Sequence, residues 1–335
     1  MSAQTPRRKF MVALAALGLT MATAPSSLAA PSEPSTGEAV ITLLGTAGGP
    51  PPHVDRSQPA TLFEVDGHSY LIDAGENVGQ QLVRANMPVA KVGTAFITHL
   101  HWDHTLGLGY LMATGWMRGR NTPMPIYGPP GLAKYVGLET KALDLGEAIF
   151  RPQTPYRPEL ATLYPVHVVS LAGPAEIYRD DAVTVTAVPN THFSVVHAKP
   201  HSYGPDLSYS YRFDTRHGSV VFTGDTGPSV AVTQLAKGAD ILVSEICDLD
   251  SIRAALEKVQ SPDRIQGLMR HMAEQHLSPE EVGKMAAAAG VKKLVLTHFV
   301  IGENFNPEDF VAKIRPYYKG EIIVGQDLAS IKLGD

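Results

Sequence analysis

Residues 98–107, THLHWDHTLG, carry three histidines and one aspartate within six positions, directly after the apolar run GTAFI. Side chains alternate along an extended chain, so His99 and His101 point to the same side and can bind one metal ion. Asp103 and His104 follow where the strand has ended and the chain must turn, which lets them face a second ion. The next residues, TLGLGYLMA, predict a helix that holds this loop. A histidine-rich surface loop is the alternative for this segment taken alone.

A single cysteine, Cys247, stands among 13 histidines, which excludes an internal disulfide and a cysteine-based zinc cluster. A metal would therefore be held by histidines and carboxylates, a ligand set that suits zinc and also manganese or iron. Three further polar residues follow β-rich runs: His192 after AVTVTAVPN, Asp225 after SVVFTG and His298 after KKLVLT. Ligands from several strand ends can converge on one rim, so this recurrence favours a metal site over a polar loop.

The composition is that of a soluble globular protein, with 335 residues of which 44% are hydrophobic and 18% charged. Short β-rich runs bounded by glycine or turn residues occur in two halves of similar style, at 39–45, 60–65, 68–75 and 93–99, and then at 182–190, 207–215, 219–227, 239–246, 292–299 and 320–327. Two such halves with helices between them predict an α/β domain of two packed sheets. Residues 118–165, rich in Pro and Gly, are expected to form loops with short helical pieces that border a site.

Helices are expected at 77–87 and at 278–290. The second begins SPEE, with Ser278 as N-cap and Glu281 three residues later, which is the pattern of a capping box. It ends at Gly290, the residue type that most often closes a helix in the left-handed conformation.

Residues 1–30 have the pattern of a signal peptide, which predicts a periplasmic or secreted protein. PRRKF precedes the apolar run MVALAALGLTMA and then SSLAA, with cleavage expected near Ala29 or Ala30. Arg7 and Arg8 fit a twin-arginine signal, and the general secretory route is the alternative. The apolar run is shorter than about 20 residues, which argues against a membrane anchor. Residues 31–38 are expected to be a linker and 39–335 the folded metallo-hydrolase domain.

Nine segments, in this order, resemble the metallo-β-lactamase fold superfamily and, within it, the ribonuclease Z-like branch that includes arylsulfatases and phosphodiesterases: LLGTAGGPP, LIDAGE, THLHWDHTLGL, VPNTHF, SYRF, FTGDTGP, ADILVSEI, HLSPEEVGKMA and LTHF. The resemblance covers about residues 39–330. It implies a four-layer αββα sandwich with a dinuclear centre at the sheet edges. The implied cofactors are two Zn²⁺ ions, with Mn²⁺ or Fe²⁺ as alternatives. The implied ligands are His99, His101 and His192 for one ion, Asp103, His104 and His298 for the other, and Asp225 bridging the two.

Two more residues complete the implied site. The resemblance implies that His276, in HLSPEEV, lies beside the reaction centre as a proton donor or phosphate contact, and that Glu245, in ADILVSEI, orients it. An exposed residue ahead of a helix cap and a plain strand-end carboxylate are the respective alternatives. Asp73, in LIDAGE, is expected to hold the HxHxDH loop through hydrogen bonds, and His197 and His201, in SVVHAKPHSYG, to line the mouth of the site.

Physical chemistry explains why these residue types occur together. Two ions about 3.5 to 4 Å apart can share a water molecule, lower its pKa from about 15.7 towards 7, and hold the attacking and substrate oxygens. Metal-bound hydroxide is then the expected nucleophile. Asp103 can hold it by a hydrogen bond, and His276 can protonate the leaving group.

The connection between SYRF and GDT bears on the substrate. In ribonuclease Z a long glycine- and proline-rich arm grips transfer RNA, and bacterial members carry it between the matching segments. Here YRFDTRHGSVVFTGDTGP joins them directly, and the net charge of the chain is -5. We therefore expect an exported hydrolase of small-molecule esters, phosphodiesters ahead of aryl sulfates, with no nucleic-acid partner.

A lactonase or β-lactamase on the same centre is the enzymatic alternative. Zinc β-lactamases of the superfamily generally carry Cys or Ser where Asp225 stands, whereas a lactonase keeps the Asp. A non-catalytic metal-binding protein would be expected to have lost ligands, and this chain keeps all seven. A homodimer is an open alternative that the sequence does not decide.

Overall fold

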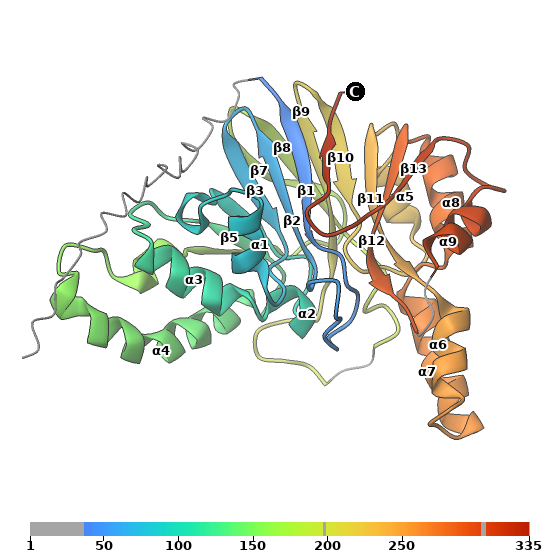
Figure 1. The fold of residues 1–335 in the computed structure, drawn as a ribbon, viewed down its shortest axis with the longest axis horizontal. Coiled ribbons are helices and arrows are strands. Elements are labelled where there is room, and N and C mark those ends of the chain that lie inside the picture. The colour runs from blue at the N-terminus through green and yellow to red at the C-terminus, as the bar shows by residue number, and fades with distance from the viewer. Residues whose placement is uncertain (1–36, 197–198, 303–305, 335) are drawn as a thin grey trace, which may run out of the picture. The chain divides into compact units, whose positions relative to one another are not determined.

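The computed structural model describes residues 37–196, 199–302 and 306–334. The predicted signal peptide, nearly all of the predicted linker and His197 lie outside these residues. The described chain forms two seven-stranded mixed sheets that pack face to face, with helices on both outer faces (Figure 1). This arrangement confirms the predicted four-layer αββα sandwich.

The first sheet joins a β-meander at the start of the fold to a parallel half. Its strand order is β14 (Ser330–Lys332), β1 (Ala39–Gly45), β2 (Ala60–Val65), β3 (His68–Ile72), β4 (Thr94–Phe96), β5 (Ile126–Gly128) and β6 (Val166–Val168). The antiparallel pair β2 and β3 is closed by Asp66 and Gly67, with φ of 50° and 86°. Two consecutive positive φ angles are what a two-residue turn requires to match the strand twist.

The second sheet is built in the same way. Its strand order is β13 (Glu321–Val324), β12 (Lys293–Val300), β11 (Ile241–Cys247), β10 (Gly218–Phe222), β9 (Tyr209–Thr215), β8 (Val183–Pro189) and β7 (Ala175–Arg179). Strands β7 to β10 are antiparallel, whereas β10 to β13 are parallel. Strand β11 is buried along its whole length, as expected for a parallel strand that is covered on both faces.

Aromatic side chains fill the space between the sheets. Phe63 of the first sheet lies edge-on to Phe213 of the second, with ring centroids 5.7 Å apart, and Phe96 lies 5.2 Å from the same ring. Tyr209, Tyr211 and Phe213 alternate along β9, so all three point into this core. Each such ring buries a large apolar area, which makes this layer a main source of stability.

Helices cover the outer face of each sheet. The first sheet packs against α1 (Val78–Arg84), α3 (Leu108–Met117) and α4 (Leu132–Phe150), and the second against α5 (Val230–Leu235), α8 (Pro279–Ala289) and α9 (Pro307–Ile314). The predicted caps of α8 are present: the Ser278 hydroxyl accepts from the backbone N–H of Glu281 at 3.3 Å, and Gly290 closes the helix with φ 67°. Within the described residues, no helix combines the length and apolarity needed to cross a bilayer.

The expectation of loops with short helical pieces over 118–165 is wrong for α4, which has 19 residues. Its Leu, Ala, Lys and Glu residues favour a helix. However, apolar residues such as Leu138, Leu145 and Ile149 occupy exposed positions of this helix, so its apolar residues do not form a single stripe that sequence periodicity could detect. The pair α6 (Leu249–Leu256) and α7 (Pro262–Gln275), which projects beside the second sheet in Figure 1, was not predicted either.

Candidate metal centre

The structure brings all seven predicted ligand residues together at one edge of the sandwich. They form two groups that share Asp225, and within each group the potential ligand atoms lie within 4.8 Å of one another. One group is His99, His101, His192 and Asp225, and the other is Asp103, His104, Asp225 and His298. The division agrees with the two ligand sets that the resemblance implied.

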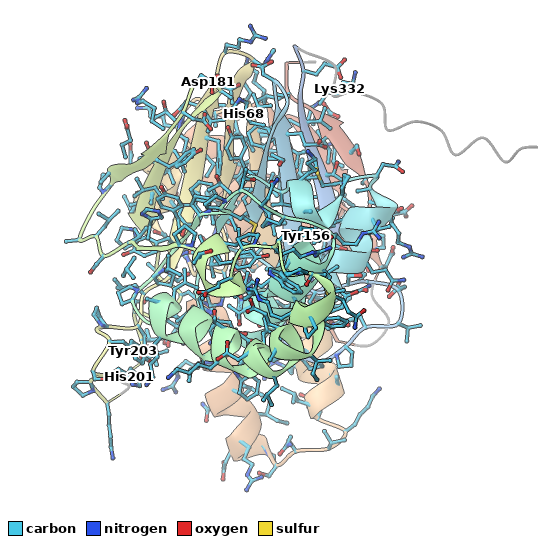
Figure 2. All side chains as sticks on the ribbon, turned by 90° about the vertical axis from the view of Figure 1, so that its left-hand side faces the viewer. His68, Tyr156, Asp181, His201, Tyr203 and Lys332 are labelled. Atoms are coloured by element: carbon cyan, nitrogen blue, oxygen red, sulfur yellow. The ribbon has the colours of Figure 1, made fainter. Side chains whose placement is uncertain are left out.

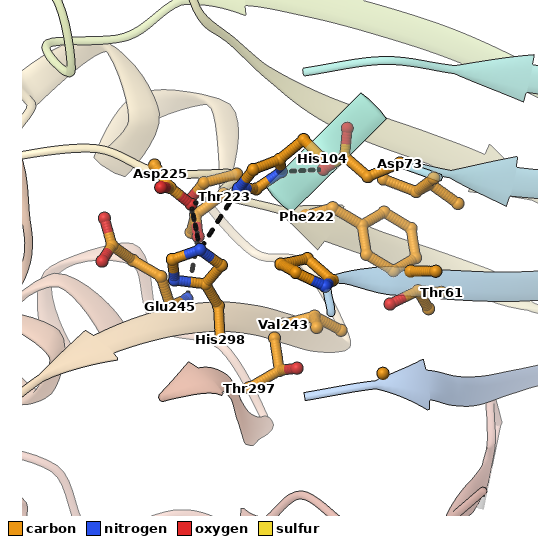
Figure 3. Close-up of a pocket in the computed structure, with 15 residues that line it drawn as sticks. Thr61, Asp73, His104, Phe222, Thr223, Asp225, Val243, Glu245, Thr297 and His298 are labelled. Atoms are coloured by element: carbon orange, nitrogen blue, oxygen red, sulfur yellow. Dashed lines mark hydrogen bonds and ion pairs between the residues drawn. The ribbon is translucent and has the colours of Figure 1, made fainter. Parts of the chain in front are cut away.

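The carboxylate of Asp225 stands between the two groups. Its Oδ2 lies 3.8 Å from Nε2 of His99 and 3.9 Å from Nε2 of His192. Its Oδ1 lies 3.3 Å from Nε2 of His104 and 3.1 Å from Nε2 of His298. One oxygen therefore faces each group, which is the geometry of a bridging carboxylate. Figure 3 shows His104 and His298 pointing toward Asp225.

The HxHxDH segment changes conformation within its length. His101 is extended, with φ -64° and ψ 153°, and a single-turn helix, α2 (Trp102–Thr105), begins directly after it. The turn carries Asp103 and His104 to the second group, as predicted. Six of the seven side chains are buried, whereas His101 is exposed and lies on the solvent side of the centre.

Asp73 supports this segment from behind, as expected. Its Oδ1 accepts from the backbone N–H of Thr98 at 2.8 Å, and its Oδ2 pairs with Nδ1 of His104, also at 2.8 Å. Because this contact occupies Nδ1, it leaves Nε2 of His104 to face Asp225. His192 is held in the same way, since its Nδ1 lies 3.0 Å from the carbonyl oxygen of Gln275.

His298 reaches the centre through a bulge. Thr297 and His298 of β12 both stand opposite Glu245 of β11, where the register of the two strands shifts. His298 has φ 46°, in the left-handed region that side chains other than glycine rarely adopt. Bulges and strained residues of this kind concentrate where a fold must direct a side chain into a site.

The buried ligand atoms fit a divalent cation. Within the described residues, Nε2 of His99 and Oδ1 of Asp103 are buried and have no hydrogen-bond partner. Burial lowers the pKa of His99 well below its usual range and that of His192 to about 3, which leaves both imidazoles neutral as metal ligation requires. Buried polar atoms without partners are costly, and a cation would satisfy them.

His276 and Glu245 form a pair beside the second group. His276 ends α7, and its Nδ1 lies 2.7 Å from Oε2 of Glu245, which is almost fully buried. Burial opposes the charged imidazole, but the Glu245 carboxylate outweighs it and raises the pKa of His276 to about 9. The His276 ring lies 5.1 Å from that of His192. The geometry thus favours an oriented imidazole at the centre over a free surface residue.

Sequence reasoning missed two neighbours of the centre. Thr98 links Asp73 to the segment, and its hydroxyl lies 3.1 Å from Nδ1 of His99. The Phe193 ring packs 5.5 Å from that of His99 and 5.1 Å from that of His101. Both residues directly precede or follow a predicted ligand, which is the only signal that could have singled them out.

Known proteins share both the sequence pattern and this architecture. The family described as the β-lactamase superfamily domain matches residues 68–299. The chain belongs to the β-lactamase superfamily. Within this superfamily, it is 34% identical over 301 residues to a protein named Ribonuclease Z from Mycobacterium bovis (strain BCG / Pasteur 1173P2), a match that covers 88% of this chain and 98% of the relative.

Solved structures of the superfamily have the same fold. The metallo-β-lactamase fold protein YhfI from Bacillus subtilis has a TM-score of 0.62 at 19% identity, covering 88% of this chain and 99% of that one. The short form of human tRNase Z also has a TM-score of 0.62, at 22% identity and the same coverage. With its fold, its relatives and its two His/Asp groups, the protein is a metal-dependent hydrolase of the superfamily that binds divalent metal.

Two predictions about the substrate are wrong. The relative with 34% identity is named a ribonuclease, which contradicts a hydrolase of small phosphodiesters or aryl sulfates and the absence of a nucleic-acid partner. The direct connection between SYRF and GDT misled the prediction. The aligned 301 residues cover 98% of this ribonuclease and 88% of the present chain, so the ribonuclease has no long segment without a counterpart here. A missing arm therefore does not separate the two proteins.

Proposed function

We propose that the protein is a metal-dependent endoribonuclease that hydrolyses phosphodiester bonds in RNA, with precursors of transfer RNA as the first substrate class to test. The observation that carries this proposal is the 34% identity to a ribonuclease Z along nearly its whole length. The acidic net charge of -5 does not oppose it, because RNA binding depends on local charge around a site and not on the total.

We assign the two groups around Asp225 to two Zn²⁺ ions. His99, His101 and His192 would hold one ion, and Asp103, His104 and His298 the other, with one oxygen of Asp225 directed at each. Bound there, two ions would lower the pKa of a water molecule and offset negative charge on the phosphoryl oxygens.

Two residues of the chain can orient the attacking water and protonate the leaving oxygen. The carboxylate of Asp103 lies in the second group and can accept a hydrogen bond that orients the attacking water, whose proton passes to solvent. Glu245 occupies Nδ1 of His276, which leaves Nε2 of that ring to donate a proton. A bond forms between the water oxygen and phosphorus, the bond to the leaving oxygen breaks, and His276 protonates that oxygen.

Cleavage of a defined RNA tests this assignment. Purified protein loaded with Zn²⁺ is incubated with a transfer RNA transcript that carries a 3′ extension, and the ends of the products are mapped. We expect cleavage at one position, its loss in EDTA, and its loss in the Asp225→Asn variant. His68→Ala, a change at a partly exposed residue outside the centre, serves as the active control. Metal-loaded protein that leaves the RNA intact would contradict the proposal.

A further inference from the structure

The loop between β8 and β9 carries a stacked pair of rings that the centre does not use. The His201 and Tyr203 rings lie 4.6 Å apart and only 8° from parallel. Asp206 contacts both, because its Oδ2 lies 3.2 Å from Nε2 of His201 and its Oδ1 accepts from the Tyr203 hydroxyl at 3.4 Å. Figure 2 shows the two side chains next to one another on this loop. One carboxylate therefore holds the rings in a fixed arrangement.

The pair packs against the short loop between β5 of the first sheet and α4. A Cβ added to Gly131 would lie 3.1 Å from two carbons of the Tyr203 ring, so the ring packs closely against this glycine. Gly204, with φ 115°, similarly approaches Pro130, and its N–H donates to the carbonyl of His201 at 3.2 Å. Both glycines therefore let the ring-bearing loop pack closely against residues 130 and 131.

The anchor lies beside the metal centre. The added Cβ at Gly131 would also lie 2.8 Å from the side chain of Leu100, the residue between His99 and His101. In the first turns of the helix that follows, the Tyr135 hydroxyl donates to the carbonyl of Thr105, at the end of the HxHxDH turn, at 3.0 Å. The ring pair is thus connected to the HxHxDH segment through Gly131 and Leu100.

The exposed part of this pair has the chemistry that binds unpaired bases. The His201 side chain is 37% exposed, and Tyr203 backs one face of its ring. The exposed ammonium of Lys134 lies 5.6 Å from the centroid of the Tyr203 ring, which places a positive charge at the same surface. Single-stranded RNA is commonly bound by stacking of bases on aromatic or histidine rings, with basic side chains near the backbone.

We propose that His201, backed by Tyr203, is a stacking platform for one unpaired nucleobase of an RNA substrate near the cleaved phosphodiester, with Lys134 beside the RNA backbone. The proposal rests on the proposed ribonuclease function. It makes His201 a specificity residue that acts on substrate binding and not on the chemical step.

The test combines variants of His201 with abasic RNA. Each unpaired nucleotide near the cleavage position is made abasic in turn, and KM and kcat are measured for the wild type, His201→Ala and His201→Phe. A lost stacking contact of about 1.4 kcal/mol corresponds to a tenfold change in KM. We expect His201→Ala to raise KM for intact RNA about tenfold with kcat unchanged, and His201→Phe to restore it. When the base that stacks on His201 is the one removed, the wild type and His201→Ala should have equal KM, because neither can make the stacking contact.

His68 offers a matched control, because its ring also lies parallel to a tyrosine, at 6.4 Å from Tyr70, and also contacts an aspartate. Figure 2 shows His68 at the opposite end of the view from His201. His68→Ala should leave KM unchanged. The stacking proposal would be overturned by an unchanged KM in His201→Ala, or by a KM difference between His201→Ala and the wild type that is the same on every abasic RNA. RNA cleavage by the wild type would still support the ribonuclease function in that case. Wild-type protein that cleaves no RNA would overturn both.

Discussion

His276 illustrates how the immediate surroundings of one side chain determine its chemistry. Its sequence context, ahead of a helix cap, is equally compatible with an exposed polar residue. In the folded chain it is 11% exposed and bound through Nδ1 to Glu245, which is itself buried in β11. The pair therefore presents one oriented N–H toward the centre, which is what a proton donor needs.

Replacing His276 by Ala should lower kcat for RNA at least about 100-fold, because the leaving oxygen loses its proton donor. The metal content should stay unchanged, since His276 is not among the seven assigned ligands. His271→Ala removes an exposed histidine from the same helix and is the control for both measurements. Loss of metal together with activity in His276→Ala would assign a structural role to this residue.

At the level of elements, the centre depends on how closely the ends of the two sheets approach. After β10 the chain reaches Asp225 through Gly224, which has φ 56°. A Cβ added there would lie 2.9 Å from the side chain of Thr98 and 3.0 Å from the carbonyl of Tyr209. The glycine thus allows the bridging aspartate of one sheet to lie against the HxHxDH segment of the other.

Gly224→Ala should destabilise the protein and lower its metal content, because the new methyl group separates Asp225 from the HxHxDH segment. Gly238 is a matched control, since it has φ 66° and no atom within 4 Å of an added Cβ. Gly238→Ala should cost only the conformational penalty of about 1–2 kcal/mol, with full metal content. Denaturant unfolding and metal analysis measure the two effects. Equal losses in both variants would show that the close approach to Thr98 is not critical.

For the whole molecule, metal binding should couple the two halves of the sandwich. His298 lies in β12 of the second sheet, and His192 and Asp225 follow β8 and β10 of that sheet, whereas the HxHxDH segment follows β4 of the first. Ions bound between them stabilise the native state only, since the unfolded chain has no such arrangement.

Removal of metal by a chelator should therefore lower the Tm. A free-metal concentration 100-fold above Kd corresponds to about 2.7 kcal/mol of stabilisation. Differential scanning calorimetry of protein to which Zn²⁺ is returned should show recovery that saturates near two ions per chain. Asp225→Asn should show little recovery. Saturation at one ion would contradict the assignment of two.

Export is a separate proposal about the whole chain, and it concerns residues 1–30 outside the described structure. We propose that Arg7 and Arg8 form a twin-arginine signal. Changing both to Lys should leave the protein in the cytoplasmic fraction, whereas the general secretory route would still export it. Cell fractionation with an antibody distinguishes the two, and an unchanged distribution would contradict the twin-arginine proposal.

Local sequence patterns were sufficient for much of the fold and of the centre. Short β-rich runs predicted ten of the strands, polar residues at strand ends predicted the candidate ligands, and the caps of α8 followed from Ser278 and Gly290. These features are local, because the backbone conformation of a few consecutive residues depends mainly on their own side chains and those of their sequence neighbours. Only the tertiary structure decided the contacts between distant segments, such as Tyr203 on Gly131 and Gly224 against Thr98. Such contacts arise from packing across the two sheets, and no local periodicity records them. The substrate prediction failed for a related reason, because the short connection between two matched segments does not determine which surfaces the rest of the fold brings together around the centre.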